Sequence, residues 1–206
     1  MLNQATDPFA RIAGYYEELV REYGHDARAC DYGRPQSQEV KFRVLSEVMA
    51  LDHCRILDVG CGFADFYRYL KARYSGVRYH GIDICPAMVK EAQRINPGLG
   101  VQVANILDYS ASEPVHVVTA NGIFYLLGEE AWPLMQRMVA RMFELAEVAV
   151  AFNSLSAWAE DKEEGEFYAD PLQVIEFCRR LTPWVTLRHD YHPRDFTVYM
   201  YKAART

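Results

Sequence analysis

Hydrophobic and polar positions along the chain change their spacing near residue 53. Before it, apolar side chains recur three or four positions apart, a period that predicts two helices at 9–23 and 36–50. After it, short apolar runs alternate with helical patterns. The strands predicted there are 54–59, 77–83, 99–104, 115–120, 145–152, 183–189 and 196–202. The helices predicted between them are 64–74, 86–95, 128–142 and 171–181.

This alternation of strands and helices predicts an α/β fold. We expect a doubly wound, mostly parallel seven-stranded sheet with helices on both faces. The last two strands are joined by the short link 190–195, so they form a hairpin, and one of them runs antiparallel. We expect one domain over residues 1–206, with a helical cap at 1–50 and a cofactor-binding core at 51–206. In such sheets ligands bind beyond the carboxyl ends of the strands, so the segments that follow the strands should line the site.

Composition narrows the classes of partner. The chain has 206 residues and a formal net charge of -6, and its Lys and Arg residues form no basic run, which disfavours a nucleic-acid partner. No apolar run approaches the roughly 20 residues that span a membrane. Residues 1–8 lack a basic region followed by an apolar one, so we expect no signal peptide. The five cysteines show no CxxC spacing, and reduced thiols in a cytoplasmic protein are the simplest interpretation.

A glycine-rich turn follows the first predicted strand. Gly60-Cys61-Gly62 lets the backbone approach a ligand closely, and the helix that starts after it directs unpaired N–H groups toward that ligand. Asp83 stands 23 residues after Gly60, at the end of the next predicted strand, where a carboxylate can accept hydrogen bonds from both hydroxyls of a ribose. Together the two features predict a pocket for a nucleoside-carrying cofactor.

Asp65 distinguishes between cofactors of this kind. A dinucleotide-binding turn reads GxGxxG, and Asp65 takes the place of its third glycine. A carboxylate there would repel a pyrophosphate, so the turn favours a cofactor without a phosphate. An oxidoreductase that binds NAD remains the alternative.

Three segments resemble motifs of the class I S-adenosylmethionine-dependent methyltransferases. Asp58-Val59-Gly60-Cys61-Gly62 resembles the first motif of that family, Gly81-Ile82-Asp83-Ile84 resembles its acidic strand end, and Val118-Thr119-Ala120-Asn121-Gly122 is similar to its fourth-strand motif. The resemblance extends over about residues 50–202. It implies a Rossmann-like core, S-adenosyl-L-methionine as the cofactor and methyl transfer as the reaction.

The resemblance also implies which residues contact the cofactor. They are Asp58, Gly60, Cys61, Gly62, Asp83, Ile84, Asn105, Ile106, Asn121 and Gly122. We expect Asp58 to hold the backbone amides of the turn and to lie near the ammonium group of the methionine part. The chain departs from the family at Ala64, where a third glycine is usual, and at Asn105, where an Asp often meets the adenine amine.

Methyl transfer from a sulfonium is an in-line displacement, which requires that the two partners are aligned and water is excluded. A base is needed only where the acceptor keeps a proton. By resemblance, the N-terminal helices form one wall of the acceptor pocket. His25 is therefore the expected proton acceptor, with Tyr16 as the second catalytic candidate. A surface position for His25 and core packing for Tyr16 are the structural alternatives.

The residues expected to bind the acceptor lie on the cap and on loops that follow the strands. They are Tyr15, Tyr125, Asn153, Trp158 and His192. A loop of about 18 residues that begins at Asn153 is interpreted as an acceptor-binding lid, and its charged part 160–166 as mobile and solvated. His189 and His192 lie close together in the sequence, which we attribute to turn structure around Pro193, and we expect no metal.

A small, aromatic or apolar metabolite is the expected methyl acceptor. Aromatic residues make up 13% of the chain, and many stand at strand ends and on the cap, where they favour stacking on a flat or apolar molecule. The alternatives are a protein or tRNA substrate, and a non-catalytic sensor or partner subunit that binds S-adenosylmethionine. The methylated atom and the oligomeric state stay open, with a homodimer as one arrangement.

Overall fold

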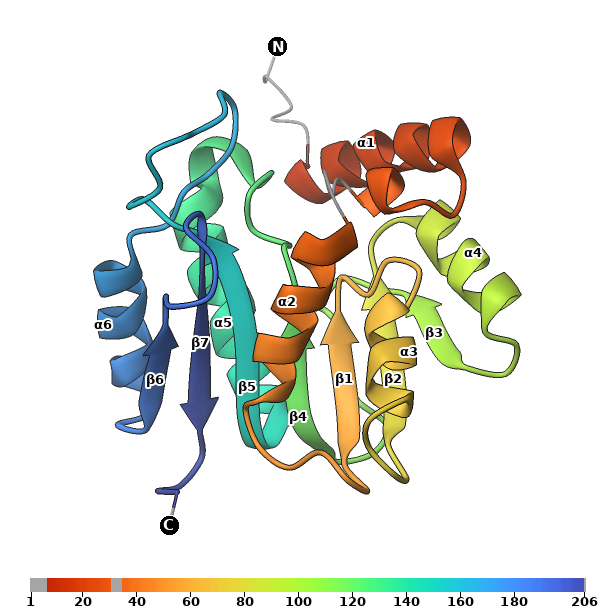
Figure 1. The fold of residues 1–206 in the computed structure, drawn as a ribbon. Helices are drawn as coiled ribbons and strands as arrows, with labels where there is room; N and C mark the ends of the chain where they lie inside the picture. Colours follow the sequence, from red (N-terminus) through yellow and green to blue (C-terminus); the bar gives the residue numbers. More distant parts are fainter. Residues whose placement is uncertain (1–6, 31–34, 206) are drawn as a thin grey trace.

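The computed structural model describes residues 7–30 and 35–205 (Figure 1). Residues 1–6, which hold most of the stretch from which we expected no signal peptide, and residues 31–34 lie outside the described part. The strands are β1 (Arg55–Val59), β2 (Arg78–Asp83), β3 (Gly100–Val103), β4 (Val115–Ala120), β5 (Ala146–Leu155), β6 (Val185–Arg188) and β7 (Asp195–Tyr201). The helices are α1 (Pro8–Tyr23), α2 (Pro35–Ser46), α3 (Asp65–Lys71), α4 (Pro86–Ile95), α5 (Ala131–Leu145) and α6 (Pro171–Leu181), with the 3-10 turns η1 (Ala27–Cys30) and η2 (Gly128–Glu130).

The strands form one seven-stranded sheet in the order β3-β2-β1-β4-β5-β7-β6. Neighbouring strands from β3 to β5 pair in parallel, whereas β7 runs antiparallel to both β5 and β6. The predicted doubly wound α/β fold, with one antiparallel strand in the terminal hairpin, is therefore confirmed. The strand order reverses between β1 and β4, and a switch point of this kind is where such sheets bind ligands.

Helices cover both faces of the sheet, and each face has its own hydrophobic core. α5 and α6 pack on one face and bury Met135, Met142 and Val174. α2, α3 and α4 pack on the other face, where Leu45 and Leu70 are fully buried. α1 contacts α4 and lies beyond the carboxyl ends of the strands (Figure 1). The predicted cap is thus divided, because α1 covers the strand ends whereas α2 belongs to a layer of the sandwich.

Side-chain caps explain where two helices begin. Asp170 accepts a hydrogen bond from Leu172 N at 2.9 Å, and Pro171 occupies the first turn of α6. Asp7 accepts from Phe9 N at 3.1 Å at the start of α1. In each case a carboxylate satisfies an N–H group that has no partner within the helix.

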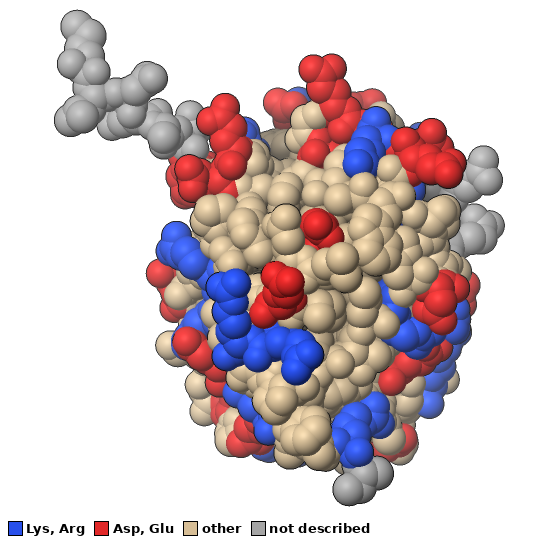
Figure 2. Space-filling view, turned by 90° about the vertical axis from the view of Figure 1, so that its left-hand side faces the viewer, with Lys and Arg blue, Asp and Glu red and all other residues tan. Residues whose placement is uncertain are grey.

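The side of the molecule formed by α6 and β6 carries charges of both signs. Figure 2 shows acidic and basic side chains interspersed around an area with few charges, and the described basic residues of this face form no continuous stripe. Exposed apolar side chains on or beside these elements include Leu172, Leu181 and Trp184. In the described part of the chain, every helix is too short or too polar to cross a membrane.

The largest difference from the predicted elements lies at the end of β5. The predicted strand ends at residue 152 and a lid begins at Asn153, but β5 continues to Leu155. Asn153 pairs with Thr197 of β7, and Leu155 pairs with Asp195. Asn and Ser favour turns locally, so the long-range ladder with β7 overrides the local preference here.

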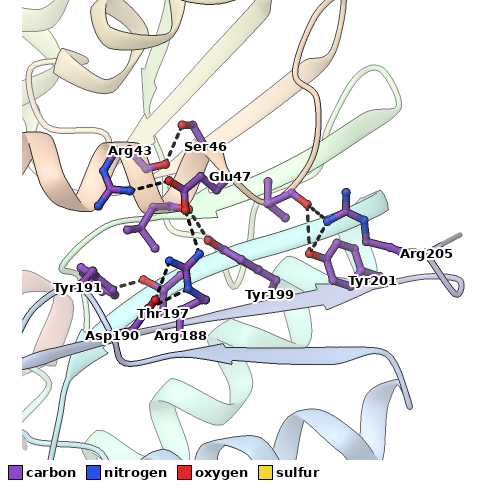
Figure 3. Close-up of polar contacts among 12 residues, drawn as sticks. Arg43, Ser46, Glu47, Arg188, Asp190, Tyr191, Thr197, Tyr199, Tyr201 and Arg205 are labelled. Atoms are coloured by element: carbon purple, nitrogen blue, oxygen red, sulfur yellow. Dashed lines mark hydrogen bonds and ion pairs between the residues drawn. The ribbon is translucent and has the colours of Figure 1, made fainter.

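Side chains of β7 hold the carboxyl end of α2 (Figure 3). The Tyr199 hydroxyl donates to the Val44 carbonyl, and the Tyr201 hydroxyl donates to the Val48 carbonyl at 3.1 Å. Arg205 Nη1 donates to the same Val48 carbonyl at 2.7 Å. The carbonyls at a helix end lack partners within the helix, so these bonds fasten α2 to the sheet.

We expect Tyr199→Phe to lower the free energy of unfolding by about 1 kcal/mol, because it removes one buried hydrogen bond and leaves the ring in place. Tyr67→Phe is the matched control, since Tyr67 is half-buried on α3 and lies outside this network. Urea denaturation of both variants measures the difference. An unchanged unfolding free energy for Tyr199→Phe would contradict the stabilising role of the bond.

Candidate cofactor and acceptor site

The glycine-rich turn joins β1 to α3 at the switch point of the sheet. Gly60 N and Cys61 N both donate to Ile82 O, at 2.8 and 3.1 Å, so the turn is fastened to β2. Gly60 has a φ of +69°, and a Cβ there would lie 2.3 Å from Ile123 Cγ2. Glycine is therefore required at this position for its backbone angle and for space. Ala64, at the usual third glycine, adopts a φ of 60°.

Asp83 stands at the end of β2 with its carboxylate fixed by backbone amides. Gly62 N donates to Asp83 Oδ2 and Cys85 N donates to Asp83 Oδ1, each at 2.8 Å. Burial raises the pKa of the Asp83 carboxyl, and the bonds from Cys85 and Gly62 oppose that rise. Asp83 lines the cavity described below, so its carboxylate is placed where a ribose can reach it.

Asp58 is buried behind the turn and is held by two hydroxyls. The Tyr79 hydroxyl donates to Asp58 Oδ2 at 2.6 Å, and Thr119 Oγ1 donates to Asp58 Oδ1 at 2.8 Å. Burial raises the pKa of Asp58 to about 6, although both hydroxyl donors lower it. The prediction that Asp58 holds the backbone amides of the turn is wrong, because these amides bond to Ile82 O and to the Asp83 carboxylate.

A cavity opens between the carboxyl ends of the strands and α1. The residues expected to contact the cofactor all line it: Asp58, Gly60, Cys61, Gly62, Asp83, Ile84, Asn105, Ile106, Asn121 and Gly122. Asp65 also lines the cavity, and its carboxylate is unfavourable for a phosphate-bearing ligand. The structure thus brings the predicted cofactor residues together, while the contact that each makes to the cofactor stays a prediction.

Two asparagines shape the loops around the cavity. Asn105 Oδ1 accepts a hydrogen bond from Leu107 N at 3.0 Å. Asn153 is fully buried, and its Oδ1 accepts from Gly122 N while its Nδ2 donates to Asn121 Oδ1, each at 2.6 Å. Asn153 is absent from the described residues that line the cavity, so the predicted acceptor contact is corrected. It positions the loop after β4 instead.

α1 and the loop after β4 close the cavity from above. The Tyr16 and Tyr125 hydroxyl oxygens lie 2.6 Å apart, and both residues line the cavity. Arg11 Nη2 donates to Leu126 O at 2.8 Å and ties α1 to the same loop. Tyr15 packs edge-on against Tyr16 and is 38% exposed, outside the cavity wall. The predicted acceptor contact of Tyr15 is therefore corrected to a packing role.

His25 lies outside the cavity. Its Nε2 is 3.5 Å from Asp65 Oδ1, and its ring packs edge-on against Phe63 with the ring centroids 5.0 Å apart. The side chain borders a neighbouring cleft beside Arg68, and this cleft shares Phe42 and Asp65 with the cavity. This position does not support the predicted role of His25 as the proton acceptor, because His25 is absent from the described residues that line the cavity.

The loop between β5 and α6 is bonded to the turn between β6 and β7. Arg194 pairs with Glu163 at 3.1 Å and with Glu166 at 3.2 Å, and it donates to the Tyr168 hydroxyl at 2.8 Å. Residues 160–165 are exposed, in agreement with the expected solvation, and the ion pairs of Arg194 fasten Glu163 and Glu166 to the neighbouring turn. Glu166 lines the cavity, so the loop does form part of the wall.

Two further residues predicted to bind the acceptor do not reach the cavity wall. Trp158 is 51% exposed and stacks on His189, with the ring centroids 5.2 Å apart. His192 Nδ1 lies 2.8 Å from Asp195 Oδ2, and Asp195 rather than His192 lines the cavity. In the part of the chain that the structure describes, no three His, Cys, Asp or Glu side chains gather as a metal site requires.

Sequence reasoning missed the charged part of the cavity wall. Lys41 Nζ lies 3.0 Å from Asp195 Oδ1, and both residues are buried. Gln38 and Glu166 also line the cavity. Lys41 stands beside apolar positions of α2, and Asp195 stands directly before an apolar strand. A charged residue next to such positions could have indicated that these two residues lie at a site, because charged side chains are rarely buried without a partner.

Comparison with known proteins agrees with this geometry. Residues 56–144 match a family model described as a methyltransferase domain. A protein of Mycobacterium tuberculosis, whose name describes it provisionally as a methyltransferase, is 29% identical over 171 residues, which cover 76% of this chain and 98% of that protein. A trans-aconitate 2-methyltransferase of Methylobacterium nodulans is 30% identical over 88 residues, which cover 43% of this chain and only 34% of that protein.

Solved structures share the fold across nearly the whole chain. The magnesium protoporphyrin IX methyltransferase of Synechocystis PCC 6803 with bound SAH has a TM-score of 0.67 at 12% identity, and the match covers 94% of this chain and 99% of that one. The same enzyme with bound SAM has a TM-score of 0.65 at 16% identity, and the match covers 96% of this chain and 99% of that one.

The fold, the cavity and these comparisons point to one class of protein. They support a class I S-adenosylmethionine-dependent methyltransferase with a Rossmann-like fold. The cofactor expected for this class is S-adenosyl-L-methionine. The cavity fits that molecule, because Asp83 presents a carboxylate for a ribose, the turn at Gly60 carries no side chain, and Asp65 is unfavourable for a pyrophosphate.

Proposed function

We propose that this enzyme transfers the methyl group of S-adenosylmethionine to a small, apolar or aromatic metabolite. The observation that carries the proposal is that many apolar residues line the cavity together with the Tyr16–Tyr125 pair. The apolar residues on the same wall are Phe9, Ile12, Phe42, Leu126 and Leu155. Enclosed apolar pockets with a few converging polar groups are typical of small-molecule sites.

The residues of the cavity contribute mainly alignment and exclusion of water. When bound, S-adenosylmethionine supplies an electrophilic methyl group on its sulfonium. In this proposal Asp58 and Asp83 orient the cofactor, and the Tyr16 and Tyr125 hydroxyls hold the acceptor. Orientation of two partners can supply on the order of 7–11 kcal/mol of rate enhancement, so the site needs no histidine base for an acceptor that is already ionised.

We expect Tyr16→Phe to lower kcat/KM for the acceptor about tenfold, because it removes one of the two hydroxyls that would hold the acceptor. Affinity for S-adenosylmethionine should stay the same. Tyr15→Phe is the matched control, since Tyr15 is the neighbouring tyrosine outside the cavity. Equal losses in the two variants would contradict the proposed role of Tyr16.

A transfer assay with methyl-labelled S-adenosylmethionine and a panel of metabolites tests the proposed function. We expect label in a small apolar or aromatic compound. Label only in protein or tRNA would favour the macromolecular alternative, in which binding falls steeply with salt. Cofactor binding without transfer to any acceptor would favour a sensor. We further propose a cytoplasmic location, and native mass spectrometry can test a homodimer.

A further inference from the structure

Lys41 and Asp195 form a buried ion pair at one end of the cavity. Lys41 Nζ and Asp195 Oδ1 lie 3.0 Å apart, and the two side chains are 11% and 3% exposed. Asp195 begins β7, whereas Asp83 ends β2, and β1, β4 and β5 lie between these two strands in the sheet. The pair is therefore at the opposite end of the strand edge from the residue expected to bind the ribose.

A third group supports the pair from the solvent side. His192 Nδ1 lies 2.8 Å from Asp195 Oδ2, and the His192 side chain is 26% exposed. Burial alone would raise the pKa of Asp195, but the nearby His192 and the charge of Lys41 bring it below its ordinary value. One carboxylate thus lies between Lys41 and His192.

Stability alone is a weak reason for such a pair. Two buried charges lose their hydration, and apolar side chains of similar volume are often as stable or more stable in their place. The pair lies on the wall of the cavity rather than within a core. A ligand group that contacts the ammonium would give the pair a function.

The charges around the cavity limit which ligand group fits there. Lys41 is the one Lys or Arg among the described residues that line the cavity. The lining carboxylates of Asp65 and Glu166 contact Arg68 and Arg194, which lie outside the wall. Among the described lining residues, Lys41 is therefore the side chain that offers a positive charge to an anionic group on the acceptor.

We propose that Lys41 binds a carboxylate on the methyl acceptor, so that the acceptor is a small organic acid. Asp195 and His192 are positioning residues that hold the ammonium at the cavity wall. An ammonium has three N–H donors, so it can contact Asp195 and a ligand oxygen together. Charge-assisted bonds of this kind select an ionised ligand over a neutral one. The inference rests on the proposed function, and it adds an acidic group to the apolar or aromatic acceptor.

Calorimetry with matched acids and amides tests the inference. The probes are cinnamate with cinnamamide and glutarate with glutaramide, titrated into the full chain with S-adenosylhomocysteine bound. In the wild-type protein we expect at least one acid to bind about tenfold to a hundredfold more tightly than its amide, the scale of one hydrogen bond to a charged group. Lys41→Met should abolish this preference, and Lys41→Arg should retain most of it.

Two further variants separate recognition from folding. Lys90→Met, on the exposed side of α4, removes the same charge elsewhere and should keep the preference. Lys41→Met/Asp195→Asn leaves no unpaired buried carboxylate and should bind S-adenosylhomocysteine like the wild type without preferring acids. Equal binding of acids and amides, binding of neither, or an intact preference in Lys41→Met overturns the inference. If the wild-type protein does not bind S-adenosylhomocysteine, the proposed function is overturned instead.

Discussion

Replacing Asp58 by asparagine should raise the free energy of unfolding of the cofactor-free protein by about 3 kcal/mol at pH 7. Burial raises the pKa of Asp58 from an ordinary value of 3.8 to about 6, so the ionised carboxylate is costly in the folded state. Asparagine keeps the shape and removes the charge. Its amide can donate to one of the two hydroxyls of Tyr79 and Thr119 and accept from the other, because a hydroxyl can do both.

The sign of the pH dependence follows from the raised pKa of Asp58. The folded protein binds the Asp58 proton more tightly than the unfolded chain does. The stability that this proton contributes is fully present below about pH 4 and is lost as the pH rises through about 6. Urea unfolding of the wild type and Asp58→Asn at several pH values from about 4 to 7 measures the difference in their free energies of unfolding. The titration of other carboxyls cancels in this difference, because both proteins share it. A difference that does not grow with pH, or a less stable variant at pH 7, would contradict the assignment.

Asp83→Ala should weaken binding of S-adenosylmethionine by roughly 1–3 kcal/mol, about tenfold to a hundredfold in Kd. The carboxylate is expected to accept bonds from the ribose, and it also fixes the turn through Gly62 N and the start of α4 through Cys85 N. Its removal therefore loses ligand contacts and leaves two backbone donors without their acceptor.

Binding calorimetry and a thermal unfolding scan are needed together for this variant. Asp108→Ala is the matched control, since Asp108 is an exposed carboxylate on the loop after β3. We expect the control to bind like the wild type. An Asp83→Ala protein that is folded and binds the cofactor with unchanged affinity would remove Asp83 from the ribose site.

The fold could be predicted from the sequence because its signals are local. Apolar runs at the strands, helical periods between them and the proline at the start of α6 all report short-range preferences. The errors arose where long-range pairing decides. α2 ends at Ser46 rather than at the predicted residue 50 and is fastened there by tyrosines of β7, and β5 extends to Leu155 because it pairs with β7.

That the residues expected to bind the cofactor line one cavity was predictable for the same reason, since they follow strands that end at one edge of the sheet. The rest of the cavity wall was not predictable. It combines α1, α2, the loop after β5 and the start of β7, and no spacing in the sequence relates them. His25 and Tyr15 are close to Tyr16 in the chain, yet only Tyr16 lines the cavity. Lys41 and Asp195, far apart in sequence, form the buried pair beside it.

Isothermal titration of the full chain with S-adenosylmethionine and, separately, with NAD tests the central claim most directly. The claim is that the turn at Gly60 and the carboxylate of Asp83 accept a nucleoside without a phosphate, and that Asp65 excludes a pyrophosphate. We predict saturable binding of S-adenosylmethionine at one site and no binding of NAD. Binding of NAD with no heat from S-adenosylmethionine would contradict the account.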